Sequence, residues 1–108
     1  MLRTKKQIKN ICEECPVAKT ANLIGDTFTL LIIRDVLIKS RRFCELEASL
    51  LGVSSRTITK KLKFLKEKGI IERHSYKEKP PRVEYSITEK GQLLSKIIET
   101  MRIYGKNI

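Results

Sequence analysis

Single Gly and Pro residues divide this chain of 108 residues into short segments, and their spacing limits what it can fold into. Proline suits the first turn of a helix, whereas glycine favours the position just after its C-terminal end. Apolar residues recur at helical intervals between these breaks. The pattern predicts four short helices before residue 70, at 16–24, from Asp26 or Thr27 to 38, within 41–52, and over 54–68.

After residue 69 the pattern changes to two β-compatible runs, IIERHSY and RVEYSIT. They are joined by KEKPP, whose two prolines cannot continue a hydrogen-bonded ladder but suit the tip of a hairpin. Thr88 then begins a last helix that is apolar along one broad side. The order helix, helix, short helix, tight turn, helix, hairpin, helix predicts a winged helix-turn-helix, a mainly α fold with a small β-hairpin (α+β).

A chain of this length is expected to form a single domain over residues 1–108. A domain this small leaves about a third of its potential surface unburied, so a partner subunit would help to cover it. The predicted parts are an N-terminal arm or helix at 1–15, the helix-turn-helix at 42–69, the wing at 70–88 and a C-terminal dimerisation helix at 89–108.

The charge of the chain indicates a polyanionic partner. Lys and Arg total 23 against 12 acidic residues, which gives a formal charge of +11 and a pI near 9.8. Nucleic acid is the first candidate and an anionic membrane surface the second. The longest apolar run, FTLLII at 28–33, is far shorter than the ~20 residues that span a bilayer, and the first residues do not resemble a signal peptide. An odd count of three cysteines suits a reducing cytosol, so a cytoplasmic protein is expected.

The segment 54–68, SSRTITKKLKFLKEK, collects six basic residues against one acid. Ile58, Leu62 and Leu65 define one apolar face, so the basic side chains point away from the core. In the predicted fold this helix enters the major groove, and the wing reaches the adjacent groove or backbone. The predicted DNA-binding residues are Ser54, Ser55, Arg56, Thr57, Lys60, Lys61 and Lys63 on the helix, and Lys77, Lys79 and Arg82 in the wing.

These residues differ in what they can recognise. The guanidinium of Arg56 can bond two acceptors of one guanine, which makes it the best candidate for base recognition. Lys60 and Lys61 are flexible point charges that are better matched to phosphate. Two alternatives remain open: the basic helix face is a solvated surface, and the wing is a solubilising hairpin.

Four stretches, CPVAKTANLIG, TLLIIRDVL, RFCELEASLLGVSSRTITKKLKFL and PPRVEYSITEKG, resemble the HxlR family of MarR-like winged-helix transcription regulators. The resemblance covers roughly Cys15 to Ile98 and implies a homodimeric bacterial or archaeal regulator that binds operator DNA. It departs from the family pattern at Phe28, Cys44 and Leu51. The residues that fall on the family's recognition-helix and wing-exit patterns are Ser54, Arg56, Thr59, Leu62, Arg82, Val83, Glu84 and Tyr85.

The last helix also favours a homodimer, because it offers more apolar surface than one face of a small domain can cover. Packing within the chain is the alternative. Residues 2–11 add Leu2, Ile8 and Ile11 for contact with a partner and four basic side chains for a DNA arm. The predicted interface residues are Leu94, Ile97, Ile98, Met101 and Tyr104.

The cysteines suggest thiol chemistry more than metal binding. Cys12 and Cys15 form C-x-x-C, but a zinc site needs four ligands, and Cys44 and His74 belong to other elements. Cys15 precedes Pro16 at a helix start, where exposed N–H groups favour a thiolate. Some members of the resembled family sense oxidants through the matching cysteine. Cys12 is the candidate resolving thiol, either within the same subunit or across the dimer. A packed structural role for Cys15 is the alternative, and Cys44 is expected to be partly buried.

The sequence thus predicts a DNA-binding transcriptional regulator that acts as a homodimer, with possible thiol-based redox sensing. No catalytic constellation is found in the sequence, so the protein is not expected to be an enzyme or to need a cofactor. A small-molecule effector stays unassigned. Two rival functions are a winged-helix module that binds an acidic protein partner and, more remotely, a thiol-disulfide enzyme.

Overall fold

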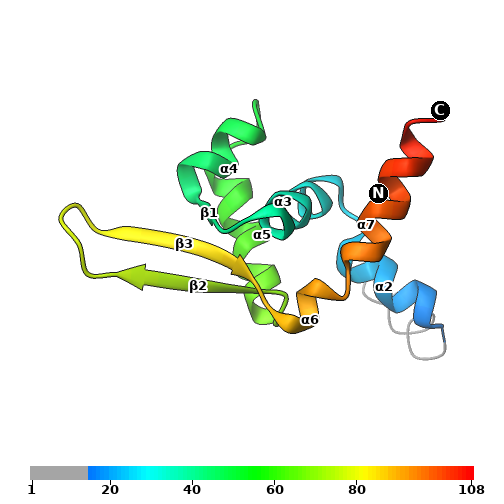
Figure 1. Cartoon of the computed structure of the whole chain (residues 1–108), viewed down its shortest axis with the longest axis horizontal. Helices are drawn as coiled ribbons and strands as arrows, with labels where there is room; N and C mark the ends of the chain where they lie inside the picture. The colour runs from blue at the N-terminus through cyan, green and yellow to red at the C-terminus, as the bar shows by residue number, and fades with distance from the viewer. Residues whose placement is uncertain (1–14) are drawn as a thin grey trace.

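The computed structural model describes residues 15–108. It is mostly helical with a small antiparallel sheet, and the predicted fold class is confirmed (Figure 1). The hairpin projects away from the helices, which cluster at its base. In chain order the elements are α2 (Pro16–Ile24), α3 (Thr27–Ile38), β1 (Arg41–Arg42), α4 (Phe43–Ser49), α5 (Ser55–Glu67), β2 (Ile71–Tyr76), β3 (Arg82–Ile87), α6 (Glu89–Gln92) and α7 (Ser95–Gly105).

The helices begin and end where the local signals predicted. Asp26 is the N-cap of α3, and its carboxylate accepts a hydrogen bond from the backbone N of Thr29 at 3.1 Å. Ser54 caps α5 in the same way. Gly52 and Gly69 adopt left-handed φ values of 88° and 74°, which are unfavourable for residues that carry a Cβ atom. These two glycines set the tight turn before α5 and the stop after it.

The sheet contains one strand that the sequence did not predict. Its order is β1-β3-β2, with all pairs antiparallel. The hairpin pairs Ile71 with Ile87 at its base and Tyr76 with Arg82 near its tip. The sequence placed residues 41 and 42 in the segment of a short helix, but Arg41 pairs with Tyr85 instead. This correction arises because a two-residue strand has no periodicity of its own.

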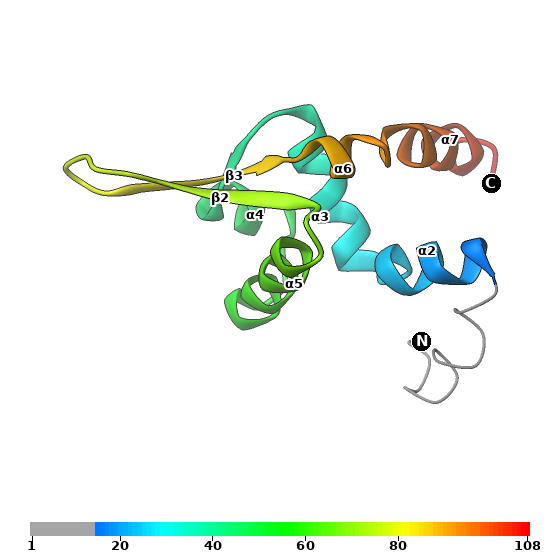
Figure 2. The same cartoon turned by 90° about the horizontal axis from the view of Figure 1, so that it is seen from below.

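The core lies around α3, which runs through the centre of the helical part (Figures 1 and 2). Ile32, Ile33 and Val36 of this helix are buried, although Ile38 at its end is exposed. Side chains from α4, α5 and the hairpin base pack against it. The fully buried apolar members include Ile32, Ile33, Leu46, Ile58, Leu65, Ile70 and Ile71.

The predicted last helix is divided in two, which corrects the sequence interpretation. Thr88 caps the first turn as expected. The backbone N of Leu94 then bonds to the carbonyl of Gly91 at 3.0 Å, a tighter i to i−3 bond that separates α6 from α7. A Cβ on Gly91 would meet the carbonyl of Ile70 and the side chain of Ile87. Glycine therefore permits a close approach between α6 and the hairpin base.

Candidate nucleic-acid interface

The basic helix α5 is fixed to the domain by its apolar side. Ile58, Leu62 and Leu65 are buried beneath it, as their spacing predicted. Ser54 accepts a hydrogen bond from the backbone N of Thr57 at 3.1 Å and holds the first turn. Figure 2 shows α5 at an outer edge of the helical part. The side opposite its buried residues therefore faces solvent in a fixed orientation.

Three basic side chains share this outer side. Arg56, Lys60 and Lys63 are all exposed. At 100° per residue they fall within a sector of about 60° around the helix axis. Within residues 15–108, none of the three forms an ion pair. Their charges are therefore available to a polyanion placed along α5.

The hydroxyl groups predicted to touch DNA already have partners inside the domain. Ser55 donates a hydrogen bond from Oγ to Oε2 of Glu47 at 2.7 Å. The hydroxyls of Ser54 and Thr57 lie 2.9 Å apart and are hydrogen-bonded to each other. These contacts join α5 to α4 and complete its N-terminal cap. The contacts of these hydroxyls with DNA remain a prediction, whereas their structural role within the domain is observed.

Lys61 lies on the flank of α5 and differs from its neighbour Lys60. Its ammonium Nζ is 3.1 Å from Oδ2 of Asp26, and its side chain is 23% exposed. Burial works against the charged form of Asp26, but hydrogen bonds from Thr29 and Lys61 outweigh it and lower the pKa of the carboxyl. Asp26 is therefore ionised at neutral pH and binds Lys61.

The wing carries two free cations and one that is held in place. Lys77 and Lys79 lie exposed at the hairpin tip and form no ion pair among the described residues. Arg82 lies 3.2 Å from the carboxylate of Glu78 and 3.4 Å from that of Glu84. Its guanidinium also lies 4.2 Å from the centre of the Tyr76 ring. Arg82 thus contacts residues on both sides of the hairpin tip, while Lys77 and Lys79 stay exposed at the tip itself.

The sequence interpretation missed the acidic side chains that engage these cations. Glu78 precedes Arg82 by four residues, a spacing that could have suggested their pairing. No such local spacing links Asp26 to Lys61, which are joined only by the packing of α3 against α5. Acidic partners therefore divide the predicted DNA-binding residues into free cations and cations bound within the domain.

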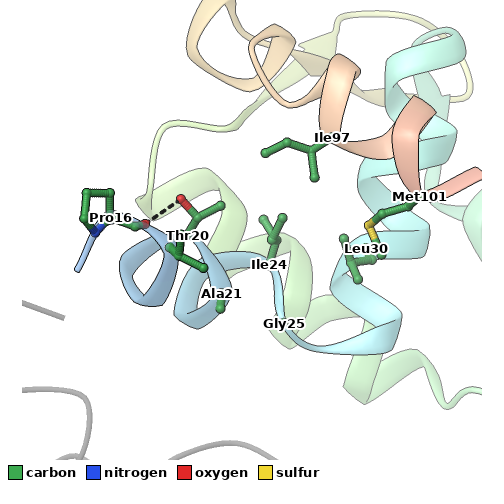
Figure 3. A pocket seen from close by; sticks show the side chains of 9 residues that line it. Pro16, Thr20, Ala21, Ile24, Gly25, Leu30, Ile97 and Met101 are labelled. Atoms are coloured by element: carbon green, nitrogen blue, oxygen red, sulfur yellow. Dashed lines mark hydrogen bonds between the residues drawn. The ribbon is translucent and has the colours of Figure 1, made fainter. Parts of the chain in front are cut away.

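A second surface, the apolar groove, lies between α2 and α7 (Figure 3). Its volume is about 500 Å³, and its lining is almost entirely apolar. Ile97 and Met101 project into it from α7, opposite Ile24 of α2 and Leu30 of α3. Val17 at its edge is largely exposed. Apolar side chains left exposed together in this way mark a surface suited to another apolar surface.

The predicted dimer residues separate into two groups. Ile97, Met101 and Tyr104 are 37%, 46% and 69% exposed, so they are available to a partner. Leu94 is only 7% exposed and belongs to the core of its own domain, which corrects its assignment to an interface. Ile98 is partly buried against the same core. The exposure of these side chains therefore rises along α7, from Leu94 at its start to Tyr104 near its end.

The cysteines lie apart in the fold. Cys15 is the N-cap of α2, and its Sγ accepts a hydrogen bond from the backbone N of Ala18 at 3.5 Å. Its side chain is half-buried. Cys44 is exposed in the first turn of α4, so the expectation of partial burial is wrong. Cys12 and the basic side chains of the arm lie outside the described residues.

Neither a metal site nor a membrane-spanning helix is found within residues 15–108. No group of three or more His, Cys, Asp or Glu side chains is placed to hold a metal ion in this part of the chain. His74 bonds through Nε2 to the hydroxyl of Ser86 at 2.9 Å and lies 3.3 Å from Glu72. Among the same residues, no helix has the length and apolar character needed to cross a bilayer.

Comparison with known proteins connects this geometry to a family. The model of the HxlR-like helix-turn-helix family matches residues 23–108. The uncharacterised HTH-type transcriptional regulator YvaP of Bacillus subtilis is 37% identical over 90 residues, which are 82% of this chain and 83% of that protein.

Solved structures give the same result in three dimensions. A MarR-family transcriptional regulator from Porphyromonas gingivalis W83 superposes with a TM-score of 0.83 at 39% identity, covering 87% of this chain and 92% of that one. The reduced form of the redox regulator HypR superposes with a TM-score of 0.82 at 31% identity and covers 86% and 92% of the two chains. Both similarities span nearly all of the described structure.

Proposed function

This chain belongs to the HxlR-like helix-turn-helix family of transcriptional regulators, and on that premise we propose that it binds operator DNA as a homodimer through α5 and the wing. The family and the matched relatives are regulators of transcription rather than enzymes. Each protomer would place one α5 in a major groove. If the dimer is two-fold, the half-sites lie about 34 Å, or a multiple of that, apart.

The observation that carries this proposal is the set of free cations on one side of α5. Arg56, Lys60 and Lys63 face solvent together, while the apolar side of the helix fixes their direction. Arg56 lies in the first turn, the end of a recognition helix that approaches base edges. The lysines follow one and two turns later, where phosphates flank the groove. The arrangement supports base recognition by Arg56 and backbone contact by the lysines.

The wing extends the same basic surface. Lys77 and Lys79 lie at the tip of the hairpin, which projects away from the helices, and supply charge for the minor groove or the adjacent backbone. Arg82 holds the hairpin between two carboxylates and a tyrosine ring. The division into arm, helix-turn-helix, wing and C-terminal region is proposed on the same basis.

A second copy of this chain is the proposed occupant of the apolar groove. Ile97, Met101 and Tyr104 leave much of α7 exposed, and a large exposed apolar surface marks a contact site on a small domain. Residues 1–15, which precede α2, are proposed to add to this interface and to the DNA contacts. Dimerisation would place two α5 helices on one operator. We propose that the protein acts in the cytoplasm, where that DNA lies.

A titration of labelled duplex DNA tests the proposal. Fluorescence anisotropy with a random 30-base-pair duplex, at 50 mM and 200 mM salt, should show binding that weakens steeply as salt rises. Absence of binding at both salt concentrations would contradict it and would favour the rival function, a winged-helix module for an acidic protein partner. Turnover of a disulfide substrate would instead support the thiol-disulfide enzyme.

Redox control is a second proposed property, favoured by the position of Cys15. The thiol lies at the N-terminus of α2, next to Pro16, which lines the apolar groove. Oxidation there would alter a side chain at the edge of the proposed dimer interface. The similarity to the redox regulator HypR supports the same idea. Cys12 is proposed as the resolving thiol.

A further inference from the structure

Asp26 joins two elements that are distant in sequence. It is the last residue before α3, and its Oδ2 accepts hydrogen bonds from the backbone N and the hydroxyl of Thr29 at 3.1 Å and 3.0 Å. The same oxygen lies 3.1 Å from Nζ of Lys61, in the middle of α5. One carboxylate therefore caps a core helix and binds a lysine of the proposed recognition helix.

This carboxylate is fixed in position before any DNA arrives. Gly25, which precedes it, ends α2 with a backbone hydrogen bond from its N to the carbonyl of Ala21. A Cβ on Gly25 would overlap that carbonyl, so the turn between α2 and α3 leaves no room for a side chain at this position. The two bonds from Thr29 then orient the Asp26 side chain. Its lowered pKa is consistent with a charge that persists across neutral pH.

Lys61 and Lys60 provide an internal comparison on the same helix. Lys60 is exposed and has no ion pair among the described residues. Lys61 is one position further along, only 23% exposed, and its ammonium faces Asp26. To contact a DNA phosphate, Lys61 would have to give up a charge-assisted contact with an anion that is already in place. Before DNA binds, the ammonium group of Lys61 is therefore paired with Asp26, whereas that of Lys60 has no ion pair among the described residues.

We propose that Asp26 is a positioning residue that competes with DNA phosphate for Lys61 and thereby limits the absolute affinity of α5 for DNA. This inference rests on the proposed function, since it assumes that α5 docks on DNA. Phosphate contacts act on all sequences alike, so Asp26 sets affinity and salt dependence rather than base preference. Base recognition by Arg56 is separate, because Arg56 lies on the outer side of the helix.

The size of the effect follows from counterion release. One added phosphate contact steepens the slope of log affinity against log salt by about 0.9, which amounts to about fivefold in affinity near 0.15 M salt. Asp26→Asn is the appropriate substitution because asparagine is as good an N-cap as aspartate and removes only the charge. It should therefore tighten binding to random duplex DNA about fivefold. A merely structural role would weaken binding instead.

A double-mutant cycle separates the competition from other effects of the substitution. Affinity and salt slope for a random duplex are measured for the parent, Asp26→Asn, Lys61→Met and the double variant, with thermal unfolding to establish that each is folded. Loss of the Lys61 charge should weaken binding several-fold more in the Asp26→Asn background than in the parent. Glu99→Gln, which removes an exposed acid from α7 and away from α5, controls for the change in net charge.

The outcomes distinguish this inference from the proposed function. Equal losses on Lys61→Met in both backgrounds would overturn it, and so would an unaltered affinity in a folded Asp26→Asn protein. A gain in Glu99→Gln as large as in Asp26→Asn would reduce the effect to net charge and would also overturn it. Lys60→Met tests the function itself, because it should lower the salt slope in either background. If Lys60→Met lowers the slope and the cycle shows no coupling, only the role of Asp26 fails.

Discussion

Replacing Lys60 and Lys63 together by methionine should make DNA binding much less sensitive to salt. Both ammonium groups are exposed and form no ion pair with the acids of residues 15–108, and methionine keeps most of the side-chain length while it removes the charge. Each phosphate contact contributes about 0.9 to the slope of log affinity against log salt, so the double variant should lose about 1.8. Between 50 mM and 200 mM salt its affinity should therefore fall about twelvefold less than that of the parent.

The assay is a salt series of anisotropy titrations with one labelled random duplex. Lys106→Met is the matched control, because Lys106 is an exposed lysine at the far end of α7 and its loss changes the net charge in the same way. The control should keep a slope close to that of the parent. A Lys60→Met, Lys63→Met protein with the slope of the parent would refute the docking of α5 along the DNA backbone.

Three further predictions concern the groove, the thiol and the fold. Met101→Asp places a charge in the apolar groove and should raise the dimer dissociation constant at least about tenfold in sedimentation experiments; an unaltered constant would place the interface elsewhere. Oxidant should alter the DNA affinity of the parent but not that of Cys15→Ser, and identical responses of the two would exclude Cys15 as the sensor. Gly91→Ala should lower the free energy of unfolding by about 1–3 kcal/mol because its Cβ meets Ile70 and Ile87, and unaltered stability would show that α6 can move away.

Much of the fold could be predicted because its signals are local. The cap at Ser54, the apolar spacing of Ile58, Leu62 and Leu65, and the stop at Gly69 all lie within one helix, and together they predicted α5. The strand β1 could not be predicted, because it pairs with residues more than forty positions further along the chain. The break before α7 likewise depends on the contact of Gly91 with the hairpin base.

In the candidate site, too, features set by spacing along one helix could be predicted, whereas features set by tertiary contacts could not. Helical geometry at 100° per residue predicted that Arg56, Lys60 and Lys63 face solvent, and the structure confirms their exposure. The same geometry could not separate Lys60 from Lys61, because the difference lies in Asp26, which is brought alongside α5 only by tertiary packing. Charge counted along the sequence therefore does not show which cations are already paired within the domain.

The central claim, that Arg56 recognises a base through α5, is tested most directly by the selectivity of Arg56→Lys. This substitution keeps the charge but removes the two-pronged guanidinium. The operator is first obtained by sequencing DNA fragments bound by the parent, and both proteins are then titrated with operator and random duplex at one salt concentration. The operator should lose about 1–3 kcal/mol of binding free energy, well beyond the loss on random DNA. Equal losses on both duplexes would contradict the claim.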